Sequence, residues 1–172
     1  MPVSRSILAL FHYRGRCSRT GFIVFGAILL GIQISIGVVL MALGRSPDGP
    51  LGLILNLPLF WLAFTALVRR LHDIGHSGWW VVGAIFVSVV WTISAGLGAG
   101  LVLDPNALTP EHAQFYLLVV VVLLPPMSMV VWVHAKPGFA GTNRHGPVPE
   151  GFGFVATPDL LAATDTSAPI PA

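Results

Sequence analysis

Charged side chains are scarce in this 172-residue chain, making up 9% of it, against about a quarter in a typical soluble domain. So few charges cannot cover a water-facing surface. Intrinsic disorder is excluded as well, because disordered chains combine low hydrophobicity with high net charge. Here 55% of the residues are hydrophobic and the formal net charge is only +2. The composition therefore indicates an integral membrane protein.

Cysteine is almost absent. The single Cys17 excludes an internal disulfide and any metal site built from several cysteines. Cys17 lies between Arg16 and Arg19, whose positive charges would lower the pKa of its thiol. A reactive thiol also needs a base partner, and the sequence assigns none, so Cys17 is not predicted to be a nucleophile.

The sequence contains four long runs of apolar residues without charged side chains. A helix needs about 20 apolar residues to cross the hydrocarbon core, and helices are expected because lipid offers backbone groups no partners. The first run is too long for a cleaved signal sequence. The second run is the shortest. The predicted fold is an all-α integral membrane protein with four transmembrane helices, at residues 21–43, 51–68, 79–103 and 115–134.

The distribution of Lys and Arg predicts the orientation. Of the segments that flank the four runs, those on one side carry eight of the nine basic residues, and those on the other carry only Arg45. The positive-inside rule places the richer side, and with it both termini, in the cytoplasm. The chain then divides into a cytoplasmic N-terminal segment (1–20), a transmembrane domain (21–134), a cytoplasmic loop (135–156) and a disordered tail (157–172).

Small residues and amides within the runs predict how the helices associate. Gln33 and Asn56 are expected to form interhelical hydrogen bonds worth about 0.6 kcal/mol each. No Asp, Glu, Lys or Arg lies inside a predicted span, which argues against an ion-coupled transporter. Small residues at four-residue spacing predict close helix packing within the chain, with a homodimer seam as the alternative. These are Ala27, Gly31 and Ser35 in the first run, and Ala84, Ser88, Thr92, Gly96 and Gly100 in the third.

Three segments rich in Arg, His, Gly and Ser flank the predicted spans on the same side, at residues 11–22, 69–80 and 137–149. Topology brings them to one surface. Asp73 is their only acid, and a pair with Arg69 or Arg70, or with Arg16 or Arg19, would be charge-assisted. Such pairs predict a structural clasp that ties the segments to the helix ends. Ser77 is expected to cap the third helix, and either Ser18 or Thr20 is expected to cap the first.

Two further interpretations compete with a purely structural clasp. The arginines outnumber the single acid, so they are also candidates to bind phosphate or anionic lipid headgroups, helped by the two capped helix N-termini. The candidate residues are Arg16, Ser18, Arg19, Arg69, Arg70, His72, Asp73, Ser77, Asn143 and Arg144. The other interpretation is a membrane enzyme that uses His72 and Asp73 at the interface.

The spacing of His72 and His76 resembles the metalloprotease pattern His-Glu-x-x-His. However, Asp73 replaces the glutamate base, and Gly75 argues against a continuous helix. A third ligand, His12 or His145, would be available only if the segments converge, and catalytic zinc needs three protein ligands. No metal, no cofactor and no nucleic-acid partner is therefore predicted.

Three motifs occur in a characteristic order over about residues 10–150. They read Gly15-Arg16-x-Ser18-Arg19, then Arg69-Arg70-Leu71-His72-Asp73-x-Gly75-x-Ser77-Gly78-Trp79-Trp80, then Gly141-x-Asn143-Arg144-x-Gly146-x-x-Pro149. The chain thereby resembles the small bacterial inner-membrane proteins called domain of unknown function 805. It departs from them at His76, where relatives often carry Arg or Lys. The resemblance implies a bacterial inner membrane and no particular activity, so a non-enzymatic structural or interaction module is expected.

The asymmetry of Lys and Arg predicts the outcome of reporter fusions. A reporter active only in the cytoplasm should give a signal when fused after Gly151 and none when inserted near Pro47, because these positions flank the spans on opposite sides. Reporter activity in intact cells is the measurement. The reverse pattern would contradict the predicted orientation.

Overall fold

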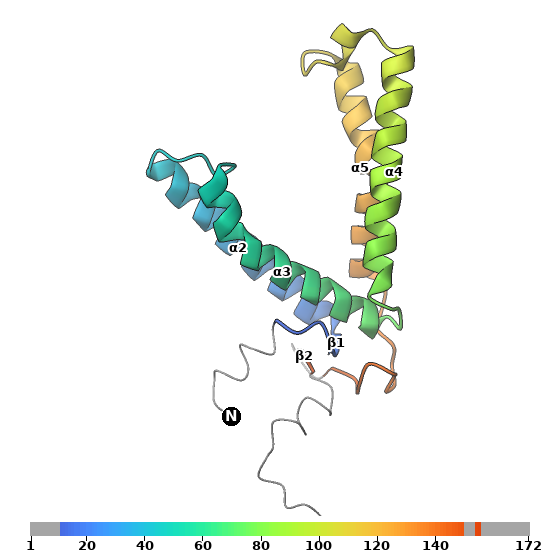
Figure 1. The fold of residues 1–172 in the computed structure, drawn as a ribbon. Helices are drawn as coiled ribbons and strands as arrows, with labels where there is room; N and C mark the ends of the chain where they lie inside the picture. Colours follow the sequence, from blue (N-terminus) through green and yellow to red (C-terminus); the bar gives the residue numbers. More distant parts are fainter. Residues whose placement is uncertain (1–10, 150–153, 156–172) are drawn as a thin grey trace, which may run out of the picture. The chain divides into compact units, whose positions relative to one another are not determined.

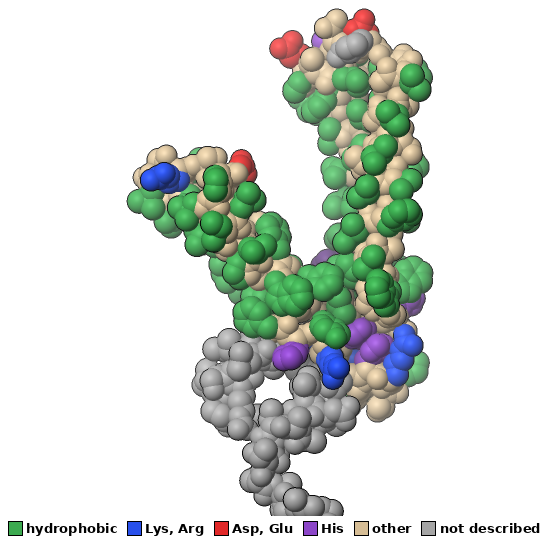
Figure 2. Space-filling model, viewed as in Figure 1, with side chains coloured by type: hydrophobic (Ala, Val, Ile, Leu, Met, Phe, Trp, Pro, Cys, Tyr) green, Lys and Arg blue, Asp and Glu red, His purple; other side chains and the backbone are tan. Residues whose placement is uncertain are grey.

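The computed structural model describes residues 11–149 and 154–155. It contains four helices that are long and apolar enough to cross a membrane, in agreement with the predicted all-α membrane fold (Figure 1). Hydrophobic side chains cover the middle of these helices, and charged side chains gather beyond their ends (Figure 2). The predicted tail at 157–172 lies outside the described residues, as does Arg5, one of the eight basic residues on the predicted cytoplasmic side. The helices are α2 (Arg19–Ala42), α3 (Pro50–Asp73), α4 (Trp79–Val102) and α5 (Ala113–Ala135).

The largest difference from the predicted spans is at the end of α3. The apolar run ends at Val68, but the helix continues to Asp73 because the polar side chains of its last turn are buried by protein contacts. Three short elements were not predicted: the 3-10 helix η1 (Pro105–Leu108) and the strands β1 (Arg16–Cys17) and β2 (Phe154–Val155). The strands pair antiparallel, with Arg16 opposite Val155.

The chain forms two compact units. One contains β1, α2, α3 and β2, and the other contains α4, η1 and α5. Each unit is a helical hairpin, as α2 lies beside α3 and α4 lies beside α5 (Figure 1). Nearly all of the three polar segments belongs to the first unit, namely residues 11–22, 69–78 and 137–149. That unit therefore contains the candidate site.

Large aliphatic side chains, not small ones, pack the α2–α3 hairpin. Leu29 and Leu40 are buried in α2, whereas Ala27, Gly31 and Ser35 are exposed. The two sets lie on opposite sides of the helix, because successive residues are about 100° apart around its axis. The small-residue series of α2 therefore does not mediate the packing of this hairpin, and the wider expectation of helix packing within the chain stays a prediction for it.

The intramembrane amides also differ from prediction. Gln33 is exposed, and the amide nitrogen of Asn56 donates to the carbonyl of Gly52 in its own helix at 2.8 Å. Local hydrogen bonding with the preceding turn competes with interhelical bonding for short polar side chains. Asn56 therefore bonds within its own helix and not, as was expected for it, between helices.

A tryptophan joins α4 to α5 at a proline. Pro125 has no N–H, so it cannot donate to the carbonyl of Val121 one turn earlier. The indole Nε1 of Trp91 donates to that carbonyl at 2.8 Å. Within lipid this bond replaces one that the helix itself cannot form, which makes Trp91 more than a packing residue.

The small-residue series of α4 is only partly buried. Ala84 and Ser88 are half-buried, but Gly96 and Gly100 are exposed and Ala95 is half-buried in their place. A series at strict four-residue spacing drifts by about 40° per step around the helix, so it cannot stay in one seam. A homodimer through Gly96 and Gly100 stays a prediction.

Candidate functional site

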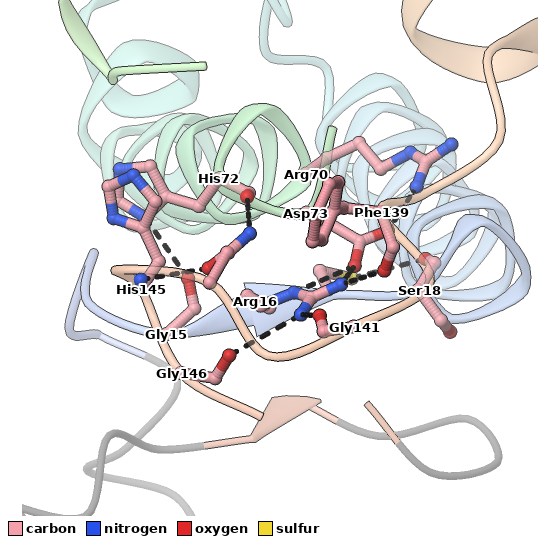
Figure 3. Close-up of polar contacts among 12 residues, drawn as sticks. Gly15, Arg16, Ser18, Arg70, His72, Asp73, Phe139, Gly141, His145 and Gly146 are labelled. Carbon is pink, nitrogen blue, oxygen red and sulfur yellow. Dashed lines mark hydrogen bonds and ion pairs between the residues drawn. The ribbon is translucent and has the colours of Figure 1, made fainter. Parts of the chain in front are cut away.

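The end of α3 and the start of α2 lie together because the two helices are antiparallel (Figure 3). Of the two predicted candidates, Ser18 and not Thr20 is the N-cap of α2, and its Oγ accepts from the Gly21 N–H at 3.0 Å. Residues 137–149 come to the same place, where the Phe139 N–H donates to the Asp73 carbonyl at 2.7 Å. All three predicted segments therefore contribute to one site.

A glycine-dependent cap ends α3 directly after Asp73. Gly75 has φ +89°, a conformation that other residues rarely adopt. The His76 N–H reaches the Leu71 carbonyl at 2.8 Å and the Gly75 N–H reaches the His72 carbonyl at 3.1 Å, which is the Schellman arrangement. The metalloprotease pattern requires both histidines on one continuous helix. His72 and His76 do not meet this requirement, because α3 ends between them.

Arg16 occupies the centre of the site and is 1% exposed. Its Nε and Nη2 donate to Oδ1 of Asp73 at 3.1 and 2.8 Å. Nη2 also donates to the Phe139 carbonyl at 2.6 Å, and Nη1 donates to the carbonyls of Gly141 at 2.6 Å and Gly146 at 3.3 Å. A guanidinium has five N–H donors, so these bonds engage the full donor capacity of Arg16.

Asp73 is the acceptor that complements Arg16. Its Oδ1 accepts both bonds from Arg16, and its Oδ2 accepts from Nη1 of the fully buried Arg70 at 2.6 Å. The carboxylate is buried, with Asp73 3% exposed. The chain passes so close at Gly138 that a Cβ there would overlap the carboxylate. We call Arg16, Arg70, Asp73 and the bonded loop 138–146 the clasp.

Asn143 fastens the loop of the clasp to α3. Its Nδ2 donates to the His72 carbonyl at 2.9 Å, and its Oδ1 accepts from the His145 N–H at 2.8 Å. Backbone bonds of 3.1 and 3.0 Å join Asn143 to Gly146. The amide thus fixes a tight turn and positions the carbonyls that face Arg16.

Two histidines stack beside this turn. The rings of His72 and His145 are parallel within 5°, with centroids 3.7 Å apart. The Gly15 carbonyl accepts from Nδ1 of His72 at 3.0 Å, and Arg144 Nε donates to Nε2 of His145 at 3.0 Å. Burial lowers the pKa of His145 from 6.5 to about 4, helped by the nearby His72 and Arg144. His145 is therefore neutral at pH 7.

Cys17 differs from its predicted character. It is fully buried, and burial raises the pKa of its thiol from 9.0 to about 12. The positive charges of Arg69 and Arg70 act in the opposite direction but are outweighed by burial. The expectation of a lowered pKa is wrong because sequence adjacency to Arg16 and Arg19 did not reveal that the thiol is removed from water.

Not all predicted site residues join the clasp. Arg69 donates from Nη2 to the carbonyl of His12, and Arg19 and Arg144 are exposed. Ser77 is half-buried. Sequence reasoning missed the backbone carbonyls of Phe139, Gly141 and Gly146; the glycine-rich composition of their segment indicated a turn but not its role. Within residues 11–149 and 154–155, no group of three or more His, Cys, Asp or Glu side chains is placed to hold a metal ion.

The chain belongs to the family described as a protein of unknown function (DUF805), whose model matches residues 10–147. The match spans every residue of the clasp. No curated protein and no solved structure matches the chain.

The clasp predicts the effect of neutralising Asp73. Asp73→Asn retains the shape but leaves Arg16 and Arg70 as uncompensated buried charges, which should lower the free energy of unfolding by about 3–5 kcal/mol. Denaturant unfolding in detergent micelles measures the change. Asp48→Asn, at an exposed position between α2 and α3, is the matched control and should be near neutral. Equal effects of the two variants would contradict a buried ion-pair network.

The histidine stack predicts a pH dependence. Because the pKa of His145 is lower in the folded than in the unfolded chain, its contribution to stability is full above pH 6.5 and is lost as the pH falls toward 4. His145→Gln should therefore lose less stability than the wild type between pH 7 and pH 4. Denaturant unfolding at several pH values measures this, and identical pH profiles would show that His145 is not buried in its neutral form.

Proposed function

We propose that the protein is a non-enzymatic structural or interaction module of the bacterial inner membrane, with both termini and the clasp on the cytoplasmic side. In this proposal the clasp holds the three polar segments in one fixed arrangement at the end of the α2–α3 hairpin. The exposed arginines around the clasp then contact anionic lipid headgroups of the cytoplasmic leaflet.

The observation that carries this proposal is that the hydrogen-bond donors of Arg16 are all engaged within the clasp. Every N–H of Arg16 is used within the protein, and both carboxylate oxygens of Asp73 accept from arginines. A ligand phosphate would have to displace Asp73 from Arg16. The geometry therefore favours a structural role for Arg16 and Asp73 over the phosphate or lipid binding that was one interpretation of the sequence.

The enzyme alternative relies on His72 and Asp73 as acid and base. A general base must reach the proton that it removes, but Asp73 is buried beneath two arginines. His72 is buried as well, and its Nδ1 is occupied by the Gly15 carbonyl. These contacts argue for positioning roles and against acid–base catalysis by this pair.

Exposed cations are the part of the site available to lipid. Among the described residues of the three segments, the one acid is buried, whereas Arg14, Arg19 and Arg144 are exposed. The accessible charge of this surface is therefore positive. Each basic residue near an anionic leaflet contributes about 1 kcal/mol of attraction. The sequence suggested lipid contact for the arginines of all three segments. The proposal restricts this contact to the exposed arginines Arg14, Arg19 and Arg144.

The proposal predicts which substitutions release anionic lipid. Arg19→Gln and Arg144→Gln should each lower retained phosphatidylglycerol and cardiolipin by about fivefold, the equivalent of 1 kcal/mol. Native mass spectrometry of identically extracted proteins measures the lipid bound per chain. Arg45→Gln, in the loop between α2 and α3, removes the same charge from the other end of the hairpin and should retain wild-type lipid.

Arg16→Lys separates the clasp from the lipid surface. Lysine cannot reproduce the planar guanidinium fork, so this variant should unfold more easily yet retain lipid. A folded Arg16→Lys protein that loses lipid while Arg19→Gln and Arg144→Gln retain it would overturn the proposal and assign a phosphate site to Arg16.

A further inference from the structure

The five residues before β1 lie along one face of α3. Three of their carbonyls accept from α3 side chains. Phe11 O accepts from Trp61 Nε1 at 3.1 Å, and His12 O accepts from Nη2 of Arg69. Gly15 O accepts from His72 Nδ1 at 3.0 Å. We refer to residues 11–15 as the arm.

The three donors show how far the arm extends along α3. From Trp61 to His72 the helix rises about 16 Å, at 1.5 Å per residue. The four residue steps from Phe11 to Gly15 span at most about 14 Å, so the arm is close to extended and the reach of the donor side chains covers the rest. Since Phe11 lies at Trp61 and Gly15 at His72, the arm runs parallel to α3 and reaches back from the clasp toward the middle of the helix.

Trp61 lies well inside the apolar part of α3, which continues to Val68. An irregular segment at membrane depth is tolerated only where the protein satisfies its backbone polar groups. The bonds from Trp61, Arg69 and His72 do this for three carbonyls of the arm. They also give the buried Arg69 a polar partner within the protein. Arm and helix thus satisfy polar groups that lipid leaves without partners.

The remaining side chains of the arm have the character of a membrane interface. Phe11 is 41% exposed and Tyr13 is 49% exposed, and aromatic rings are enriched where headgroups meet acyl chains. Arg14 is also exposed, and arginine extends its charge toward the headgroups while its stem stays in apolar surroundings. The arm is therefore apolar and cationic, with no acidic residue.

We propose that the arm is inserted in the lipid interface beside α3, with Phe11 and Tyr13 against acyl chains and Arg14 at the headgroups. The sequence assigned these residues to a cytoplasmic N-terminal segment that ends before the transmembrane domain at residue 21, so the proposal changes where the membrane domain begins. It goes beyond the proposed function, because insertion of the arm depends on neither the clasp arginines nor the orientation of the chain.

Fluorescence quenching in vesicles tests the insertion. Tyr13→Cys carries an environment-sensitive fluorophore, in vesicles of phosphatidylethanolamine and phosphatidylglycerol. Thr142→Cys, at an exposed position in the clasp loop, is the matched control. Unlabelled wild type checks that the buried Cys17 does not react. A nitroxide on the lipid acyl chain should quench the probe at position 13 several-fold more than the probe at 142, and aqueous iodide should show the reverse. Equal iodide quenching at both positions would overturn the proposal.

A second variant tests what holds the arm in place. Trp61→Phe keeps an aromatic ring but removes the N–H that bonds Phe11. In this background the probe at position 13 should become more accessible to iodide, whereas the probe at 142 should not change. An unchanged probe at position 13 would overturn the assignment of α3 as the support of the arm. If Trp61→Phe does not fold, the comparison of positions 13 and 142 in the otherwise unaltered chain still decides whether the arm is inserted.

Discussion

The buried pairing of Asp73 with Arg16 and Arg70 is the interaction on which the rest of the site depends. One carboxylate pairs with two arginines that have little contact with water. Coulomb attraction offsets the cost of removing these charges from water only when their remaining hydrogen-bonding groups are also satisfied. Three carbonyls of residues 139–146 meet that condition for Arg16. The ion pairs and the loop conformation are therefore interdependent.

A second constraint is that backbone groups within lipid need partners from the protein. Trp91 bonds the Val121 carbonyl that Pro125 leaves without its helical donor. Trp61 bonds the carbonyl of Phe11, outside any helix. In both hairpins an indole N–H thus supports a place where regular helical bonding is interrupted or absent. Both tryptophans combine an apolar body with a single donor, which suits this role in apolar surroundings.

The clasp also determines which charges remain available for interaction. Arg16, at the centre of the clasp, uses its N–H groups in internal bonds, and the only acid of the three segments is buried with it. Less central residues, such as Arg19 and Arg144, are the exposed ones. The exposed charges of this surface are consequently positive among the described residues, whereas the buried Asp73 is paired with arginines. This division is what the proposed contact with anionic lipid requires.

The sequence by itself determined the four helices, because long uncharged apolar runs have one stable solution in lipid. It also narrowed the cap of the first helix to Ser18 or Thr20 through local backbone chemistry. It also indicated that Asp73, as the only acid among surplus arginines, would be paired. Only the tertiary structure decided that Arg16 and Arg70 are the partners, while Arg69 bonds the arm. It also decided that Cys17 is buried and that backbone carbonyls complete the clasp. Those outcomes depend on the approach of three segments distant in the chain, and a carbonyl has no signature in the sequence, since every residue carries one.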